Sequence, residues 1–313
     1  MAELNTNVRV DKHGNVHINK KNRIRRFGAA DFILLFFLTL LGILILYPFY
    51  NAFLVSIVPN TVYLRYQGLM LWPPEVTMEA YTFTFKSSLI WYGYKNSILI
   101  TFFGTIYNMI LTVLCAYALT KPIPGGKFIR FAIVFTMYFS GGLIPSYLLI
   151  KDLKLMDTIA SMILPTGINI MYMLIISNYF KSLPPALEES AKIDGATDLR
   201  ILWSVILPLS LPLLATFTLY YAVERWNEWY QSFLYINKTE LQPLQIYLRN
   251  VLISMSNNLS AIAKQMMRDH TQKVSSQAIQ MATIVVTTIP ILCVYPFVQK
   301  HFVKGVMIGG IKE

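Results

Sequence analysis

A pair of acidic residues stands out in one short polar stretch, residues 183–200, which separates two strongly apolar segments. Glu188 and Glu189 follow two prolines, and such prolines suit the first turn of a helix. Carboxylates there lie near the positive end of the helix dipole. The four histidines lie elsewhere in the chain and form no catalytic constellation. Taken by themselves, such residues are most simply solvated first-turn acids, and the chemistry that they could add is a charged or hydrogen-bonded contact with another surface.

The residues around the two acids predict a helix, a turn and a second helix. Ser182 is the expected N-cap of the first helix, and the prolines 184–185 occupy its first turn. Gly195 is typical of a helix end. Thr197 or Asp198 then opens the second helix. We expect a rigid helix–turn–helix element over residues 183–200 that is attached at both ends to apolar segments. We call this element the lever.

Nucleotide and metal chemistry find little support elsewhere in the chain. The nearest approach to a phosphate loop, residues 125–128, has Lys121 where the first glycine belongs and lacks the following Ser or Thr. His13 and His17 have a spacing that suits a metal on a helix, but their surroundings read as a loop. We therefore expect no catalytic residue, no metal site and no bound cofactor.

The composition requires lipid as part of the solvent. The chain has 313 residues, of which 55% are hydrophobic and 14% charged, against about 25% charged in soluble domains. Its net charge of +11 does not indicate nucleic acid, because the cations lie at the ends of apolar stretches. A span needs about 20 apolar residues. Six stretches qualify: 32–57, 95–119, 129–150, 159–180, 202–223 and 278–298.

The distribution of cations predicts that both termini are cytoplasmic. With that orientation the inner segments hold 16 of the 27 Lys and Arg residues. Two long outer loops, 58–94 and 225–277, result, and a re-entrant or surface helix is expected over 244–270. The first 20 residues are polar and are expected to lack regular structure. The expected organisation is a cytoplasmic segment, 1–31, and one six-helix domain, 32–313, with inner segments 1–31, 120–130, 181–201 and 299–313.

The polar stretch also resembles a known signature. Glu189-Ser190-Ala191, Asp194-Gly195-Ala196 and Ile206-Leu207-Pro208 match the "EAA…G…I-LP" pattern of permeases in binding-protein-dependent ABC importers. The one departure is Ser190, where the family usually has Ala. Other segments are similar to sugar permeases of the maltose type, and two of them to the branch for complex saccharides, including uronates: 71–73, 96–97, 141–145, 226–229 and 302–305.

The resemblance implies an all-α, MetI-like type I importer permease in the cytoplasmic membrane of a bacterium. Its implied partners are a second, homologous permease, two ATPase subunits that bind ATP and Mg, an extracytoplasmic solute-binding protein, a saccharide and membrane lipid. Nucleic acid is not among them. The residues implied to couple to the ATPases are Glu188, Glu189, Ser190, Ala191, Asp194, Gly195 and Ala196.

The residues that could line the substrate path are indicated by less specific features than the signature. Aromatic faces stack on sugars, but Trp and Tyr also populate the membrane interface of any membrane protein. An ionisable residue inside a span is a functional candidate by default. The candidates are Tyr138, Asn169, Tyr172, Glu224, Trp226, Asn227, Trp229 and Tyr230.

Three other functions stay open. The same importer class could carry a peptide or polyamine. An ion-coupled transporter would place carboxylates in mid-membrane and would have no use for the lever, and a membrane-embedded enzyme would need clustered catalytic groups. The sequence supplies neither feature, so an oligosaccharide importer is preferred.

Overall fold

The computed structural model describes residues 7–10, 16–19, 29–66, 70–256, 275 and 277–293. The chain divides into two compact units, Met1–Asn51 and Ala52–Glu313. In the first unit, β1 (Asn7–Val10) pairs antiparallel with β2 (Val16–Asn19). The expected lack of regular structure is therefore wrong for these residues, because both segments alternate β-branched and polar residues. His17 lies in β2, and His13 lies outside the described residues.

Helix α1 (Ala29–Ser56) contains the first apolar stretch. Its segment Asp31–Ser56 passes as a membrane span by length and hydropathy, and none of the most apolar window is buried. Large side chains such as Phe32 and Phe36 are exposed along it. Such a helix, apolar around its whole circumference, requires lipid or another subunit as its surroundings.

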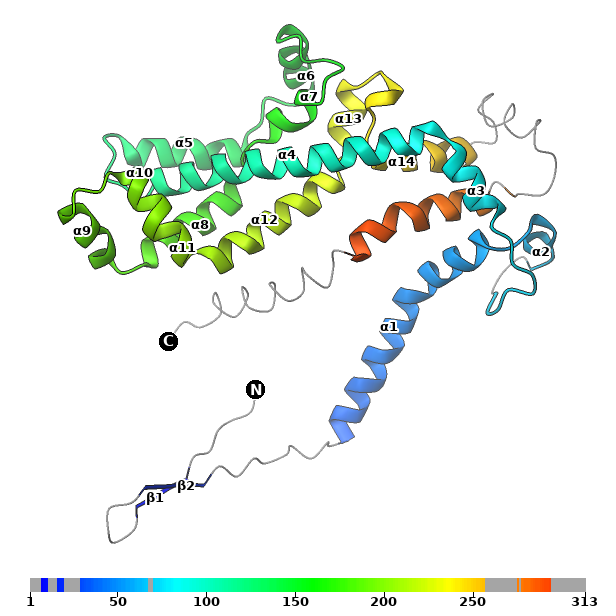
Figure 1. Cartoon of the computed structure of the whole chain (residues 1–313), viewed down its shortest axis with the longest axis horizontal. Coiled ribbons are helices and arrows are strands. Elements are labelled where there is room, and N and C mark those ends of the chain that lie inside the picture. Colours follow the sequence, from blue (N-terminus) through cyan, green and yellow to red (C-terminus); the bar gives the residue numbers. More distant parts are fainter. Residues whose placement is uncertain are drawn as a thin grey trace. The chain divides into compact units, whose positions relative to one another are not determined.

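Helix α4 (Ser88–Ala118) is the central element of the second unit and, among the residues described there, its one unbroken helix long enough to span a membrane (Figure 1). It packs along α8 (Ile170–Ser182), α12 (Leu211–Trp226) and α14 (Leu244–Ser256). Its contact face is rich in small and polar residues, which allow close helix packing inside a membrane. The main core cluster joins Ala116 and Tyr117 of α4 to side chains of α8 and α12.

The third, fourth and fifth apolar stretches are bent and not straight. α5 (Gly126–Tyr138) and α6 (Leu143–Asp152) meet at 108°. α7 (Ala160–Ile163) with η1 (Leu164–Thr166) meets α8 at 52°. α10 (Asp198–Ile201), η2 (Leu202–Ile206) and α11 (Leu207–Leu209) meet α12 at 88°.

Two of the three bends have a local cause. Gly142 has a φ of 88°, which is open to glycine, and Pro212 follows the third bend at Ser210. Of the six predicted stretches, two lie on single long helices, three on these bent pairs and one on the shorter apolar helix Gln277–Cys293. The helical fold is confirmed, whereas six straight spans are not.

Short helices fill the loops. α2 (Asn60–Arg65) and α3 (Glu79–Lys86) lie in the first long loop. α13 (Tyr230–Tyr235), η3 (Thr239–Leu241) and α14 lie in the second. The helix expected over 244–270 is present from Leu244 to Ser256, and its remainder lies outside the described residues.

Candidate functional site

The polar stretch forms the predicted helix, turn and helix. α9 runs over Pro185–Ile193, with Pro184 at the N-cap position and Pro185 in the first turn. The prediction that Ser182 caps this helix is wrong: its hydroxyl donates to Tyr179 O at 2.7 Å, because Ser182 still belongs to the end of α8. The lever therefore starts two residues later than the sequence indicated.

The turn after α9 closes on Gly195. The amide of Gly195 donates to Lys192 O at 3.0 Å, and that of Ala196 donates to Ala191 O at 2.9 Å. This bond pair is the Schellman motif, which places its C′ residue in the left-handed region. Gly195 has a φ of +74°. Thr197 then caps α10 by accepting from the amide of Arg200 at 3.4 Å.

An ion-pair network anchors the lever to the turn that follows α4. Lys121 Nζ lies 2.5 Å from Glu188 Oε2 and 3.3 Å from Asp198 Oδ1. It also lies 4.3 Å from the ring centroid of Tyr117. Burial alone would lower the pKa of Lys121, but the hydrogen bonds to Glu188 and Tyr117 outweigh it and raise that pKa. The lysine is held as a cation against both ends of the lever.

The outer face of the lever is unoccupied. Glu189 and Ser190 are exposed, and no described residue hydrogen-bonds or ion-pairs with the Glu189 carboxylate. Ile193 is 87% exposed and Leu199 is 62% exposed. Asp194 and Gly195 are exposed beside them, and Ala191 and Ala196 are half-buried. The seven predicted coupling residues are thus gathered in one projecting element, with Glu188 turned toward the rest of the chain.

The second half of the signature lies in the core. α10 continues without a break into η2, a π-helical segment that ends at Ile206. Leu202 and Ile206 are almost fully buried in the main core cluster. Single π turns inside helices are frequent at functional sites. The lever is therefore continuous in the chain with side chains that pack against α4 and α8.

Two of the predicted path residues meet directly. Tyr172 on α8 donates its hydroxyl to Glu224 Oε1 on α12 at 2.5 Å. The ring of Tyr172 also contacts those of Phe217, Tyr220 and Tyr221 at centroid distances of 5.1, 5.7 and 5.2 Å. The result is an aromatic patch with one carboxylate on its half-exposed side.

The other path candidates divide between structural and exposed positions. Asn169 accepts from the amides of Met171 and Tyr172, so its side chain caps α8 at the bend. Trp226 packs in a small apolar cluster, and Asn227 donates to Val223 O at 2.9 Å. Tyr138 is 73% exposed at the end of α5, away from these bonds.

Arg225, which the candidate set left out, is the most deeply engaged ionisable residue of α12. It is 4% exposed, and its Nε donates to Asn108 Oδ1 at 2.8 Å. Its two Nη atoms donate to carbonyls of the bent α7–η1 segment at 2.8–3.2 Å, from Met162, Ile163 and Thr166. Asn108 donates to Thr166 O and Gly167 O. The available signal was an arginine in an otherwise apolar stretch.

A second arginine lies on the surface formed by α13 and α14. The guanidinium of Arg249 lies 4.4 Å from the ring centroid of Phe233 and 5.3 Å from that of Trp229. Trp229, Tyr230 and Phe233 are 41%, 44% and 53% exposed. No described residue forms an ion pair with Arg249. Cation–π contacts hold such a group in place and leave its N–H edges open to an anion.

Comparison with known proteins decides the family. The model of the binding-protein-dependent transport system inner membrane component matches residues 90–308. The chain belongs to this family. The permease is thus a membrane transport component, and the resemblance drawn from the signature is confirmed at family level.

Relatives cover nearly the whole permease. The polygalacturonan/rhamnogalacturonan transport system permease protein YtcP of Bacillus subtilis is 39% identical over 293 residues, which are 93% of this chain and 99% of that one. Protein LplC of the same organism is 38% identical over the full length of both chains. The permease is also similar to a chain in the crystal structure of a bacterial ABC transporter involved in import of the acidic polysaccharide alginate. The TM-score is 0.80 at 34% identity, over 88% of this chain and 99% of that one.

Proposed function

We propose that this permease forms half of the pore of an ATP-driven importer for an acidic oligosaccharide. The single observation that carries the proposal is the lever, which projects from the core with an exposed face and matches the family signature. The other half of the pore is a second, homologous permease. Two ATPase subunits supply the energy, and an extracytoplasmic binding protein delivers the cargo.

The lever supplies the coupling to the ATPases. Ile193 and Leu199 are large apolar side chains in water, which favours burial in a partner groove. Glu189 adds a carboxylate without a described partner, suited to a charged contact at the groove. Glu188 has a different role, because its ion pair with Lys121 holds the lever to the permease itself. Closure of the ATPase pair thus moves α9 and, through η2, the packed core.

The proposed orientation places the lever and both termini in the cytoplasm. The excess of Lys and Arg in the inner segments favours it, as does the functional need for the lever to reach ATP-hydrolysing subunits. The surface formed by α13 and α14 then lies on the outer side, where cargo arrives.

The outer surface favours an acidic sugar. Trp229 and Tyr230 offer exposed ring faces for stacking on pyranose rings, and Arg249 offers N–H donors in the planar geometry that suits a carboxylate. The curated relative named for polygalacturonan/rhamnogalacturonan and the structure of an alginate importer both concern acidic polysaccharides. A half-buried arginine without an ion-pair partner among the described residues also disfavours a polyamine, which carries the same charge.

Transport assays with matched saccharides test the cargo. We expect the complex with its binding protein to take up oligogalacturonides faster than neutral oligosaccharides of equal length. Arg249→Gln should lower uptake of the acidic sugars about ten-fold, since one charge-assisted contact is worth roughly 1.5 kcal/mol. Uptake of the neutral sugars should not change. Lys238→Gln, on the same outer loop, is the control. Equal loss for both sugar types would refute the role of Arg249 in charge recognition.

A further inference from the structure

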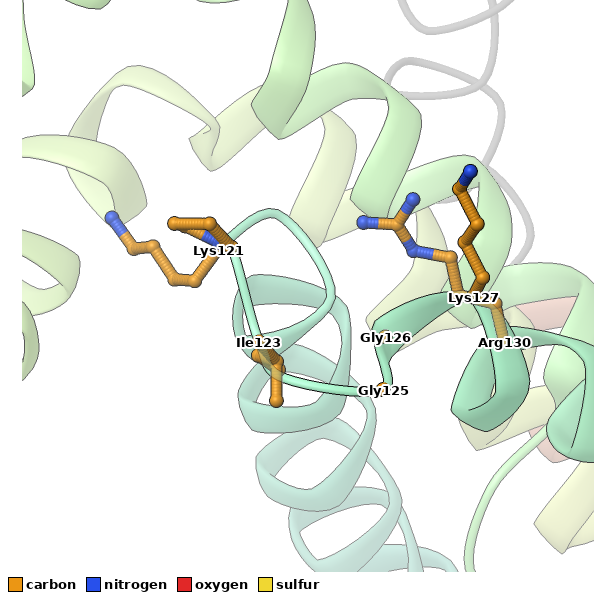
Figure 2. Close-up of a pocket in the computed structure, with 7 residues that line it drawn as sticks. Lys121, Ile123, Gly125, Gly126, Lys127 and Arg130 are labelled. Carbon is orange, nitrogen blue, oxygen red and sulfur yellow. The ribbon is translucent and has the colours of Figure 1, made fainter.

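The turn between α4 and α5 forms an open basic cavity that the transport cycle proposed above does not use. The cavity has a volume of about 360 Å³ and is lined by residues 121–123, 125–127 and 130. Three of the lining residues are cations and none is an acid. Figure 2 shows the side chains of Lys127 and Arg130 rising together from the first turn of α5, whereas Lys121 extends away from them.

The two cations that point together are not neutralised by the described part of the chain. Lys127 has no hydrogen bond or ion pair with any described residue. Arg130 donates from Nη2 to Leu119 O at 2.7 Å, which fixes its guanidinium beside the cavity and leaves its other donors open. Lys121 is different, because Glu188 and Asp198 already balance its charge.

The backbone adds to the positive potential. α5 begins at Gly126 after Gly125, whose φ is +71°, and no side chain caps this end. The amides of Gly126 and Ile129 are satisfied by local carbonyls. The helix dipole of α5 points its positive end at the same cavity.

An apolar stripe descends from the cavity along α5. Phe128, Phe131 and Phe135 are 73%, 64% and 46% exposed and follow the spacing of one helix face. No residue of α5 is buried. A cationic recess at the head of a helix with exposed aromatic side chains matches a ligand with an anionic head and a hydrocarbon tail.

We propose that this cavity binds the phosphate headgroup of an anionic membrane lipid, whose acyl chains lie along the aromatic stripe of α5. The charge of Lys127 and Arg130 selects an anionic headgroup over a zwitterionic one. The stripe selects a lipid over free phosphate, since only the lipid covers the apolar surface. The bound headgroup lies at the turn that also carries Lys121, the anchor of the lever.

Native mass spectrometry of the detergent-purified, delipidated permease, with the subunits that co-purify with it, tests the proposal. Phosphatidylglycerol and phosphatidylcholine with identical acyl chains are titrated in parallel. We expect tighter binding of phosphatidylglycerol, reduced about five-fold by Lys127→Gln and about twenty-five-fold when Arg130→Gln is added. Lys127→Arg should restore binding, and Lys151→Gln, which removes a distant lysine, should leave it unchanged.

Two further measurements distinguish lipid binding from binding of a free anion. Phe131→Ser should weaken both lipids alike, because it shortens the stripe and leaves the cations in place. Inorganic phosphate should not displace phosphatidylglycerol at equal concentration. Equal binding of the two lipids to the wild-type protein, or undiminished phosphatidylglycerol binding by Lys127→Gln, would overturn the proposal. Displacement by inorganic phosphate would also overturn it, in favour of a free-anion site.

Discussion

Lys121 and Glu188 lie 67 residues apart in the sequence, and their side chains are joined by an ion pair of 2.5 Å. The pair connects the lever to the turn after α4, the helix along which α8, α12 and α14 pack. A force on α9 therefore reaches the core by two routes: through η2, which continues its own chain, and through this ion pair. In the proposed coupling, the nine-residue helix α9 thus acts on the spans through two attachments.

Removal of that anchor should loosen the coupling. Lys121→Gln is expected to lower the free energy of unfolding by only about 1 kcal/mol, since both side chains are partly exposed. Transport per ATP hydrolysed should fall several-fold, because the lever keeps its partner-facing side but loses one attachment. Lys192→Gln is the control, since Lys192 reaches Asp198 only at 4.0 Å. The ratio of uptake to hydrolysis in proteoliposomes measures the effect.

The pH dependence of the same anchor follows from the direction of the pKa shift. The folded pKa of Lys121 is raised above its ordinary value of 10.5, so the contribution of the pair to stability is fully present below that value. It is lost only as the pH rises through the higher, folded pKa. The coupling ratio of the wild-type protein should thus be flat between about pH 6 and pH 9. A fall within that window would contradict a lysine anchor.

Gly195 offers a test of the turn alone. Gly195→Ala meets no atom within 4 Å, so its cost is the left-handed backbone, about 1–2 kcal/mol. We expect reduced recovery of ATPase subunits on co-purification. Gly195→Asn should behave like the wild type, because Asn tolerates this conformation. Loss of the subunits in both variants would mean that the side chain clashes with a partner and that backbone strain is not the cause.

Arg225 packs against Gly104, so substitutions at these two positions should have coupled effects on stability. Arg225→Met should destabilise the purified protein by about 3 kcal/mol, because it leaves several buried carbonyls and Asn108 without donors. Gly104→Ala would place its Cβ 2.9 Å from Arg225 Cδ, and the four hydrogen bonds of the guanidinium prevent it from moving aside. Thermal unfolding in detergent measures both.

The double variant decides whether this network is the cause. Gly104→Ala should cost about 1–3 kcal/mol in the wild type and markedly less in the Arg225→Met background, where no hydrogen bonds prevent the side chain from moving aside. Strict additivity of the two free-energy changes would indicate that Gly104 serves some other contact.

Asp157 holds the turn before α7 against the second long loop, 225–277. Its Oδ1 accepts from the amides of Asn237 at 2.5 Å and Lys238 at 3.1 Å, and these bonds lower the pKa of Asp157. A lowered pKa contributes stability above the unfolded value of 3.8 that is lost as the pH falls through the folded one. Asp157→Ala should therefore speed hydrogen exchange at both amides several-fold at pH 7.

The matched variant for that test is Asp157→Asn, which keeps the accepting oxygen and removes the charge. Part of the amide protection should survive in it, without dependence on pH in the acidic range. If the two amides exchange equally fast in the wild type and in Asp157→Ala, the contact does not order the loop.

The lever could be predicted from the sequence because its information is local. Proline at a helix start, glycine at φ > 0 and a capping threonine are each set by neighbouring backbone bonds, and the structure places α9, Gly195 and Thr197 accordingly. The wrong assignment of Ser182 has the same origin: a serine that ends one helix looks like one that starts the next. The apolar stretches were likewise located correctly by hydropathy.

The bend near Thr166 and the contacts of Arg225 could not be predicted in this way, because they depend on contacts between distant segments. The carbonyls freed at the bend near Thr166 are satisfied by Arg225 from α12 and Asn108 from α4, which the chain brings together only on folding. The pairing of Tyr172 with Glu224 is of the same kind. Hydropathy measures apolar content along a segment and contains no term for its partners.

The central claim is that an exposed lever with Glu189 couples this permease to ATP hydrolysis for saccharide import. The most direct measurement is the ATPase activity of the purified complex with its binding protein, with and without oligogalacturonides, in the wild type and in Glu189→Ala. We predict saccharide-stimulated hydrolysis in the wild type and its collapse in the variant, with Lys181→Gln, just before the lever, unchanged. Unaltered stimulation in Glu189→Ala would contradict the role of that carboxylate, and failure of any ATPase to co-purify with the wild type would contradict the account as a whole.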